Sequence, residues 1–268
     1  MAVAHGSKDP RAAATIAALL SVLRDRTTPS VSAHAAFLGH SVPSLGQVLS
    51  GIAVSGGGPR DVVLVPLLLT EAYHAVTDIP SQAAAASARF PGLRVRQAPA
   101  LGPHPLLLAA LERRLAEAYR GSRAQTGVVL AAAGSSDPEA NASIAALAAR
   151  WQATGGWRRV VPAYASAASP SPAEAVRALG AEGGPVVVAT YLLAPGYFSD
   201  KITAAAGAAG AAAVSAPLGA APEVADVVAE RYLSAVPGRL SVSGLADSGH
   251  AQAHVLFGSA RTPLRMRL

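Results

Sequence analysis

The chain contains an internal repeat. Residues 6–19 (GSKDPRAAATIAAL) return 128 positions later as residues 134–147 (GSSDPEANASIAAL). Alanine inflates any match here, but the shared Gly, Ser, Asp, Pro, Ile and Leu stay in one register. Two later pairs of segments also align, at the shorter offsets of 124 and 117 positions: 68–74 with 192–198, and 101–105 with 218–222. A repeat of this length predicts a tandem duplication, with two units of similar fold.

The duplication predicts two domains and a tail. We expect residues 1–122 to form the first domain and residues 126–236 its repeat, because each half is long enough to bury its own core. Residues 237–268 have no counterpart in the repeat and are rich in Ser, Gly and Arg, which favours a basic, flexible tail. Only four residues precede His5, and they span about 13 Å when fully extended. A first strand this short is one indication that the true start of the protein lies upstream.

Composition narrows the class of protein. With 51% apolar and 14% charged residues, the bulk of the chain is expected to fold. The absence of cysteine excludes disulfides and thiolate metal sites, leaves imidazole and carboxylate as the strong ligands, and suits a reducing cytoplasm. Residues 1–5 do not resemble a signal peptide.

Membrane and nucleic-acid functions are not expected. The weakly charged run 183–222 consists largely of Ala and Gly and is interrupted by Pro195 and Pro217, so it is too poor in large apolar residues for a membrane span. The net charge of +6 is diffuse and has no accompanying aromatic or helical basic stripe. This pattern disfavours nucleic acid as a partner and favours a polyanionic small molecule.

Apolar runs alternate with amphipathic or Ala-rich stretches in both halves. The expected strands are residues 1–4, 31–38, 61–69 and 93–101, then 127–133, 159–165, 185–193 and 211–218. Such alternation predicts an α/β fold of two tandem duplicated domains, each a four-stranded parallel sheet flanked by helices. Asp9-Pro10 and Asp137-Pro138 predict helix starts, with an N-cap carboxylate followed by proline at the first helical position.

In the first half, a histidine follows every expected strand: His5, His40, His74 and His104. Loops at the carboxyl ends of parallel strands share one rim, where open α/β sheets bind ligands. The second half carries other residues at these places: Ala133, Ala167, Phe198 and Ala221. Its rim is therefore expected to form a wall or lid without a titratable nitrogen.

Not every histidine is expected to be functional. His34 is expected inside a strand, and His104, between two prolines, at a helix start with a structural hydrogen bond. His5 and His74 are different, because the second half loses both imidazoles while it keeps the surrounding Gly-Ser, Asp-Pro and Leu-Leu sequence. Independent replacement of single residues does not predict this matched loss. It indicates that the shared residues maintain the fold and that the two imidazoles are functional.

Three segments, 4–10 (AHGSKDP), 73–80 (YHAVTDIP) and 101–105 (LGPHP), resemble those of the sirohydrochlorin chelatases, the small class II tetrapyrrole chelatases. The resemblance spans both halves, to about residue 235. It implies a chelatase-like fold with a cleft between two lobes. It also implies a cytoplasmic, lyase-type enzyme that inserts Co²⁺ or Fe²⁺ into sirohydrochlorin, in sirohaem or cobalamin biosynthesis. His5 and His74 would be its catalytic, metal-handling residues, and the metal ion its substrate, with no permanently bound cofactor.

The chemistry of the reaction agrees with this implication. Inserting a divalent ion into a macrocycle means removing its waters and two pyrrole protons, and neutral imidazole both ligates first-row ions and accepts protons near neutral pH. Sirohydrochlorin is a polycarboxylate that rim cations such as Lys8 and Arg11 could steer. The residues expected to bind it are Ser7, Lys8, His40 and Tyr73.

One position departs from the family pattern. Gly39 stands where family members commonly have an acidic residue. His40, next to it, either substitutes for that residue or is a solvated loop residue.

Two other classes of protein share features with this sequence. A histidine phosphatase also opens with His-Gly after a strand but needs an arginine before that histidine, and Ala4 argues against it. A noncatalytic tetrapyrrole or metal-ion carrier would use the same gap between two lobes and stays open at this point.

Overall fold

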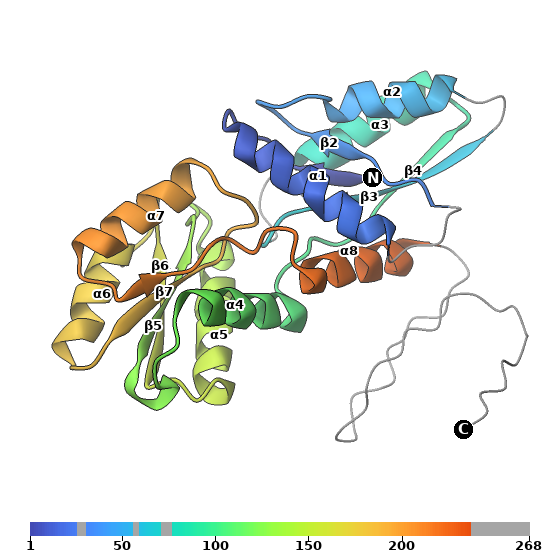
Figure 1. Cartoon of the computed structure of the whole chain (residues 1–268). Helices are drawn as coiled ribbons and strands as arrows, with labels where there is room; N and C mark the ends of the chain where they lie inside the picture. The colour runs from blue at the N-terminus through green and yellow to red at the C-terminus, as the bar shows by residue number, and fades with distance from the viewer. Residues whose placement is uncertain (26–30, 56–58, 71–76, 237–268) are drawn as a thin grey trace, which may run out of the picture.

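Two parallel sheets form the centre of the molecule (Figure 1). The structure is a computed structural model that describes residues 1–25, 31–55, 59–70 and 77–236. The first sheet has the strand order β2-β1-β3-β4 and the second has the order β6-β5-β7-β8, all strands being parallel. The repeated strand order confirms the predicted fold class of two duplicated four-stranded parallel sheets flanked by helices.

The elements of the two halves follow the same sequence. Those of the first half are β1 (Ala2–Ala4), α1 (Pro10–Arg24), β2 (Ala35–Phe37), α2 (Leu45–Val54), β3 (Arg60–Pro66), α3 (Ile79–Arg89), β4 (Leu93–Gln97) and α4 (Pro105–Ala118). After a short 3₁₀ turn, η2 (Arg123–Gln125), those of the second are β5 (Gly127–Ala132), α5 (Pro138–Thr154), β6 (Arg159–Tyr164), α6 (Pro172–Ala181), β7 (Val186–Thr190), α7 (Tyr197–Ala208), β8 (Ala213–Val214) and α8 (Pro222–Ala235).

The strands lie where the sequence predicts them, but most are shorter. The expected strand 31–38 contracts to β2, and His34 precedes that strand, so the expectation of a strand histidine is wrong. The His34 carbonyl accepts a hydrogen bond from Ala2 N at 2.8 Å, which starts the β1–β2 ladder. At the carboxyl ends of the strands, the chain leaves the sheet for the βα connections that form the rim. The strands therefore end earlier than the sequence predicts.

The predicted helix starts are confirmed. The carboxylate of Asp9 accepts from Arg11 N at 2.9 Å, and that of Asp137 accepts from Glu139 N at 2.9 Å, each just before a proline at the first turn. Both caps satisfy a backbone N–H that has no partner within the helix. In the part of the chain that the structure describes, no helix combines the length and the apolar character needed to span a bilayer.

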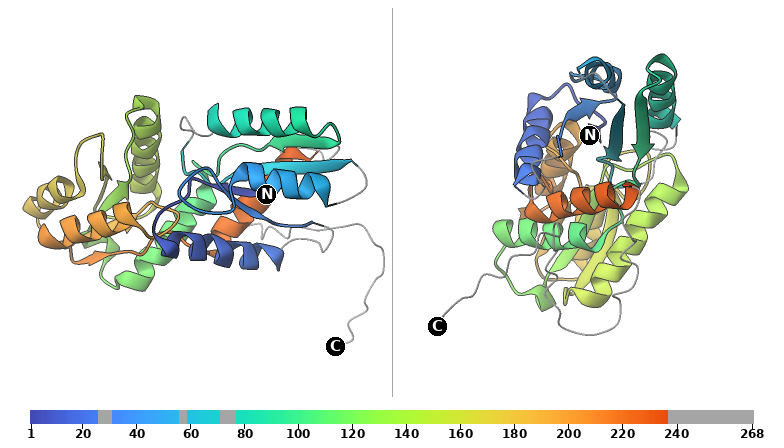
Figure 2. Two further views of the ribbon diagram at one scale, coloured as in Figure 1. Left: turned by 90° about the horizontal axis from the view of Figure 1, so that it is seen from above. Right: turned by 90° about the vertical axis from the view of Figure 1, so that its right-hand side faces the viewer.

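The last helix of each half of the sequence packs against the sheet of the other half. Helix α4 packs against β7 and β8 of the second sheet, while α8 packs against α1 and β3 of the first. The two helices also pack against each other between the sheets (Figure 1, Figure 2). We call the units built around the sheets the first and second lobe, and the exchange of helices joins them through a shared apolar core.

Equivalent arginines reinforce this exchange. Arg114 of α4 donates from Nε and Nη2 to the Leu218 carbonyl at 3.1 and 3.0 Å, and Arg231 of α8 donates from Nη2 to the Leu101 carbonyl at 3.2 Å. Because the repeat alignment pairs Leu101 with Leu218, these bonds are related as the two halves of the sequence are. Each exchanged helix thus holds the carbonyl of the loop before the other exchanged helix.

We expect Arg114→Ala to lower the free energy of unfolding by about 1.5–3 kcal/mol, the usual worth of hydrogen bonds to a charged group. Urea unfolding followed by circular dichroism measures the change. Arg150→Ala, at an exposed position of α5, is the matched control and should shift the midpoint little. Equal midpoints for the two variants would show that the exchange does not depend on the arginine bonds.

Candidate functional site

His5 directly follows the central strand of the first sheet. Strand β1 lies between β2 and β3, so its carboxyl end is at the middle of the rim. The His5 side chain is exposed, its Nδ1 lies 3.2 Å from the Gly6 carbonyl, and its own carbonyl accepts from Gly39 N at 3.0 Å. The backbone of the second βα loop therefore fixes the position of His5.

Gly6 permits this close packing of loops. Its φ is +91°, and a Cβ added there would lie 1.7 Å from the Gly39 carbonyl oxygen. Gly134 repeats the arrangement in the second lobe, with φ +84° and a Cβ position 2.0 Å from the Ser166 carbonyl oxygen. Only glycine fits such a turn. Because the glycine turn occurs in both lobes, it belongs to the fold and not to the imidazole chemistry.

The structure brings a second imidazole to His5. The rings of His5 and His40 have centroids 6.5 Å apart and planes tilted by 30°. His40 has φ +59°, and Ala167 has φ +57° at the corresponding place in the second lobe. The second lobe thus repeats the backbone of this pair but, with Ala133 and Ala167, has no imidazole.

The hydroxyl of Ser7 belongs to the loop structure. Ser7 Oγ accepts from Asp9 N at 3.0 Å, and Ser135 Oγ accepts from Asp137 N at the same distance in the second lobe. The bond is thus kept in the lobe that lacks imidazoles. Lys8 is exposed on the same loop. Substrate binding by Ser7 and Lys8 stays a prediction, and for Ser7 the loop bond is the simpler role.

Two predicted site residues, Tyr73 and His74, lie outside the described residues. The segment that follows β3 and leads toward them is bonded to the other lobe. Buried Tyr191 donates from its hydroxyl to the Leu69 carbonyl at 3.3 Å. Burial raises the pKa of Tyr191, so its hydroxyl keeps the proton that it donates. The expected cleft between the two lobes also stays a prediction.

The structure gives His104 the structural role that the sequence predicts. Its Nδ1 accepts from Leu106 N at 3.2 Å as the N-cap of α4. Its Nε2 lies 3.3 Å from Glu230 of α8, so the same ring also joins the exchanged helices.

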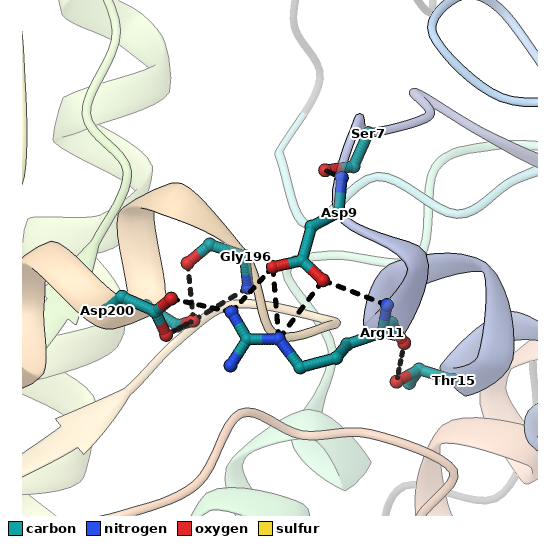
Figure 3. A network of polar contacts seen from close by, with 7 residues as sticks. Ser7, Asp9, Arg11, Thr15, Gly196 and Asp200 are labelled. Atoms are coloured by element: carbon teal, nitrogen blue, oxygen red, sulfur yellow. Dashed lines mark hydrogen bonds and ion pairs between the residues drawn. The ribbon is translucent and has the colours of Figure 1, made fainter.

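An ion-pair network joins the start of α1 to the start of α7 (Figure 3). Arg11 at the start of α1 contacts Asp9 with its Nε and Nη2, and its Nη2 lies 2.6 Å from an oxygen of Asp200 in α7. The guanidinium of Arg11 lowers the pKa of Asp9, chiefly through the side-chain hydrogen bond. Gly196, just before α7, lies so close that a Cβ added there would be 3.6 Å from Ser7 Oγ.

Sequence reasoning did not find this contact between the lobes. The rim cation Arg11, which the sequence offers for steering substrate carboxylates, is engaged with two carboxylates of the protein itself. A signal was present, since Asp200 and Lys201 are the only charges within residues 183–222, but nothing in the sequence shows which residue each one meets. Lys201 donates to the Ala165 carbonyl at 2.6 Å.

Among the residues that the structure places, no group of three or more histidine, aspartate or glutamate side chains gathers in a way that could hold a metal ion. The pair His5 and His40 is the imidazole contact seen at the rim. Imidazole nitrogens ligate metal ions at about 2.1 Å, so side-chain rotation would be needed for both rings to meet one ion.

Two duplicated parallel sheets, joined by exchanged helices and with imidazoles on only one of the meeting rims, define a two-lobed α/β protein of the chelatase-like class. The family model described as CbiX matches residues 1–118 and 127–235. The chain therefore belongs to the CbiX family, which confirms the resemblance indicated by the motifs.

Known proteins similar to this chain include enzymes of both iron and cobalt chemistry. The sirohydrochlorin ferrochelatase of Bacillus subtilis (strain 168) is 26% identical over 204 residues, covering 75% of this chain and 76% of the relative. The sirohydrochlorin cobaltochelatase of Priestia megaterium is 26% identical over 205 residues, covering 75% and 65%. The structure of SirB from Bacillus subtilis with Fe³⁺ superposes with a TM-score of 0.75 and 25% identity, covering 86% of this chain and 92% of that one.

Gly6→Ala and Gly134→Ala form a matched pair of substitutions. Each should lower the melting temperature by several degrees, because each places a Cβ against a carbonyl oxygen at positive φ. Only Gly6→Ala should also change the surroundings of His5, seen as a shift of the His5 imidazole signals in a histidine-detected NMR spectrum. The same shift in Gly134→Ala would contradict the local role of the Gly6 turn.

Proposed function

We propose that this protein inserts a divalent metal ion, Co²⁺ or Fe²⁺, into sirohydrochlorin in the cytoplasm, as a step of sirohaem or cobalamin biosynthesis. The observation that carries the proposal is the imidazole of His5 at the centre of the rim of one lobe, with His40 beside it. The relatives named above are sirohydrochlorin chelatases for iron and for cobalt, so both ions are kept as substrates.

The reaction exchanges two protons for one ion. The ion loses bound waters, the ring nitrogens replace them, and the two pyrrole N–H protons leave, so that the charge of the ion is balanced. In the tautomer of His5 with hydrogen on Nδ1, that nitrogen donates to the Gly6 carbonyl at 3.2 Å and Nε2 keeps its lone pair for the ion or a pyrrole proton. Imidazole binds Co²⁺ and Fe²⁺ without the softness of a thiolate, which suits an ion that must be passed on.

His5 and His74 are the proposed catalytic pair, and His40 is the proposed support. The 6.5 Å separation of the His5 and His40 rings lets His40 accept a proton or contact the ion after a side-chain rotation. This role fits the absence of a carboxylate at Gly39. Both rings come from the first lobe, which leaves the open side of the ion for the ring nitrogens.

Catalysis should give many turnovers. Purified protein at a concentration far below that of sirohydrochlorin and Co²⁺ should accelerate the absorbance change of metallation beyond the protein-free rate, until substrate is consumed. A carrier instead gives an absorbance change that saturates at one equivalent of protein. That outcome would reject the enzymatic proposal.

Histidine substitutions should separate the roles of the imidazoles. His5→Ala and His74→Ala should each lower kcat by about 10²-fold or more, as expected for loss of a proton-transfer or ligating group, and His40→Ala by roughly 10-fold. The measurement is the steady-state rate of Co²⁺ insertion, with circular dichroism as the check on folding.

Two further variants serve as controls for the histidine series. His40→Asn retains a residue that tolerates positive φ, so it separates loss of the imidazole from a change of backbone. Ala133→Ser alters the equivalent of His5 in the second lobe and should keep the wild-type rate. Unchanged rates in His5→Ala would refute the site.

A further inference from the structure

Large exposed apolar side chains are few in the part of the chain that the structure describes. Among the described residues, the large hydrophobic side chains left exposed are Val42 (79%), Val54 (73%), Tyr197 (73%) and Phe198 (36%). Val42 lies in the His40 loop, and Tyr197 and Phe198 are the first two residues of α7. Only Val54 lies elsewhere, at the opposite end of α2. Tyr197 and Phe198 are adjacent and their rings are in contact, and exposed apolar side chains grouped in this way indicate a binding surface.

The aromatic pair is held against the loop of His5. Gly196 directly precedes Tyr197, and a Cβ added at Gly196 would be 3.6 Å from Ser7 Oγ and 3.9 Å from Asp9 Cβ. Two residues after Phe198, Asp200 binds Arg11 of α1. The contacts on both sides of Tyr197 and Phe198 thus fasten the start of α7 to the segment that begins at His5 (Figure 3).

Hydrogen bonds within the first turn of α7 and a ring contact fix the conformation of the pair. Ser199 closes the first turn of α7, since its Oγ accepts from Gly196 N at 2.8 Å and donates to the Gly196 carbonyl at 2.8 Å. The rings of Tyr197 and Phe198 meet edge to face, with centroids 5.3 Å apart. The two rings therefore form an aromatic surface that stays exposed to solvent.

We propose that Tyr197 and Phe198 form the surface of the second lobe on which one face of the macrocycle rests, while the imidazoles of the first lobe meet its centre. The inference rests on the proposed function and names the substrate contact made by the second lobe. A conjugated macrocycle has a broad apolar face that stacks on aromatic rings, and its carboxylates lie at the edge, where they stay in water. A positioning role explains why the second lobe has Phe198 where the first has His74, each after a tyrosine.

The test separates positioning from chemistry. Tyr197→Ala combined with Phe198→Ala should raise the KM for sirohydrochlorin roughly tenfold, the loss expected for a stacking surface, while kcat and the KM for Co²⁺ change less than about threefold. Tyr197→Phe, which keeps the ring, should retain the wild-type KM. Val54→Ala, with the same 73% exposure as Tyr197, is the matched control and should have no effect.

A KM for sirohydrochlorin that is unchanged in the double variant overturns the inference. A change of oligomeric state with unchanged KM, measured by analytical ultracentrifugation, also overturns it and assigns the pair to a contact between copies of the chain. If the wild-type protein inserts no metal, the proposed function fails, but titration of metal-free sirohydrochlorin still decides this inference. Binding weakened about tenfold in the double variant would support it, and equal binding would refute it.

Discussion

The contact between the backbones of Gly6 and Gly39 determines where the paired imidazoles of this protein lie. A side chain at residue 6 would occupy the place of the Gly39 carbonyl oxygen, so the first βα loop passes the second without a Cβ between them. This packing sets His5 at the middle of the rim and His40 6.5 Å from it, ring to ring. The second lobe has the same turn at Gly134 but carries alanine at both imidazole positions. One backbone geometry thus carries two imidazoles in one lobe and two alanine side chains in the other.

The contacts between the two rims come from residues that the repeat does not reveal. Arg11 with Asp200, and Tyr191 with the Leu69 carbonyl, join the rims across 189 and 122 residues of sequence. Helices α4 and α8 join the lobes at the other side by exchanging sheets. Because each lobe covers part of the other's core, the distance between the rims is set by packing and not by a flexible linker. Such a support suits a site that has to hold an ion and a macrocycle in register.

Sequence reasoning succeeded where the signal was local. Asp9-Pro10 and Asp137-Pro138 cap helices as expected, because an N-cap depends only on residues within one turn. His104 caps α4 for the same reason, although its second contact, with Glu230, is 126 residues away and could not be anticipated. The strand ends were placed too far along the chain, since the residues that leave the sheet for the loops are as apolar as those within it. The expected strand 31–38 also starts too early, which is why it includes His34.

The amino-acid sequence alone determined the duplication, the order of strands and helices, and the loss of imidazoles from the second half, because each of these is recorded in residue type and spacing. The tertiary structure alone decided that His40 lies beside His5, that Arg11 is bound by carboxylates of both lobes, and that the last helices are exchanged. Loops that follow different strands have no fixed relation in sequence, and only the packing of the sheets and their helices brings their side chains to a common place.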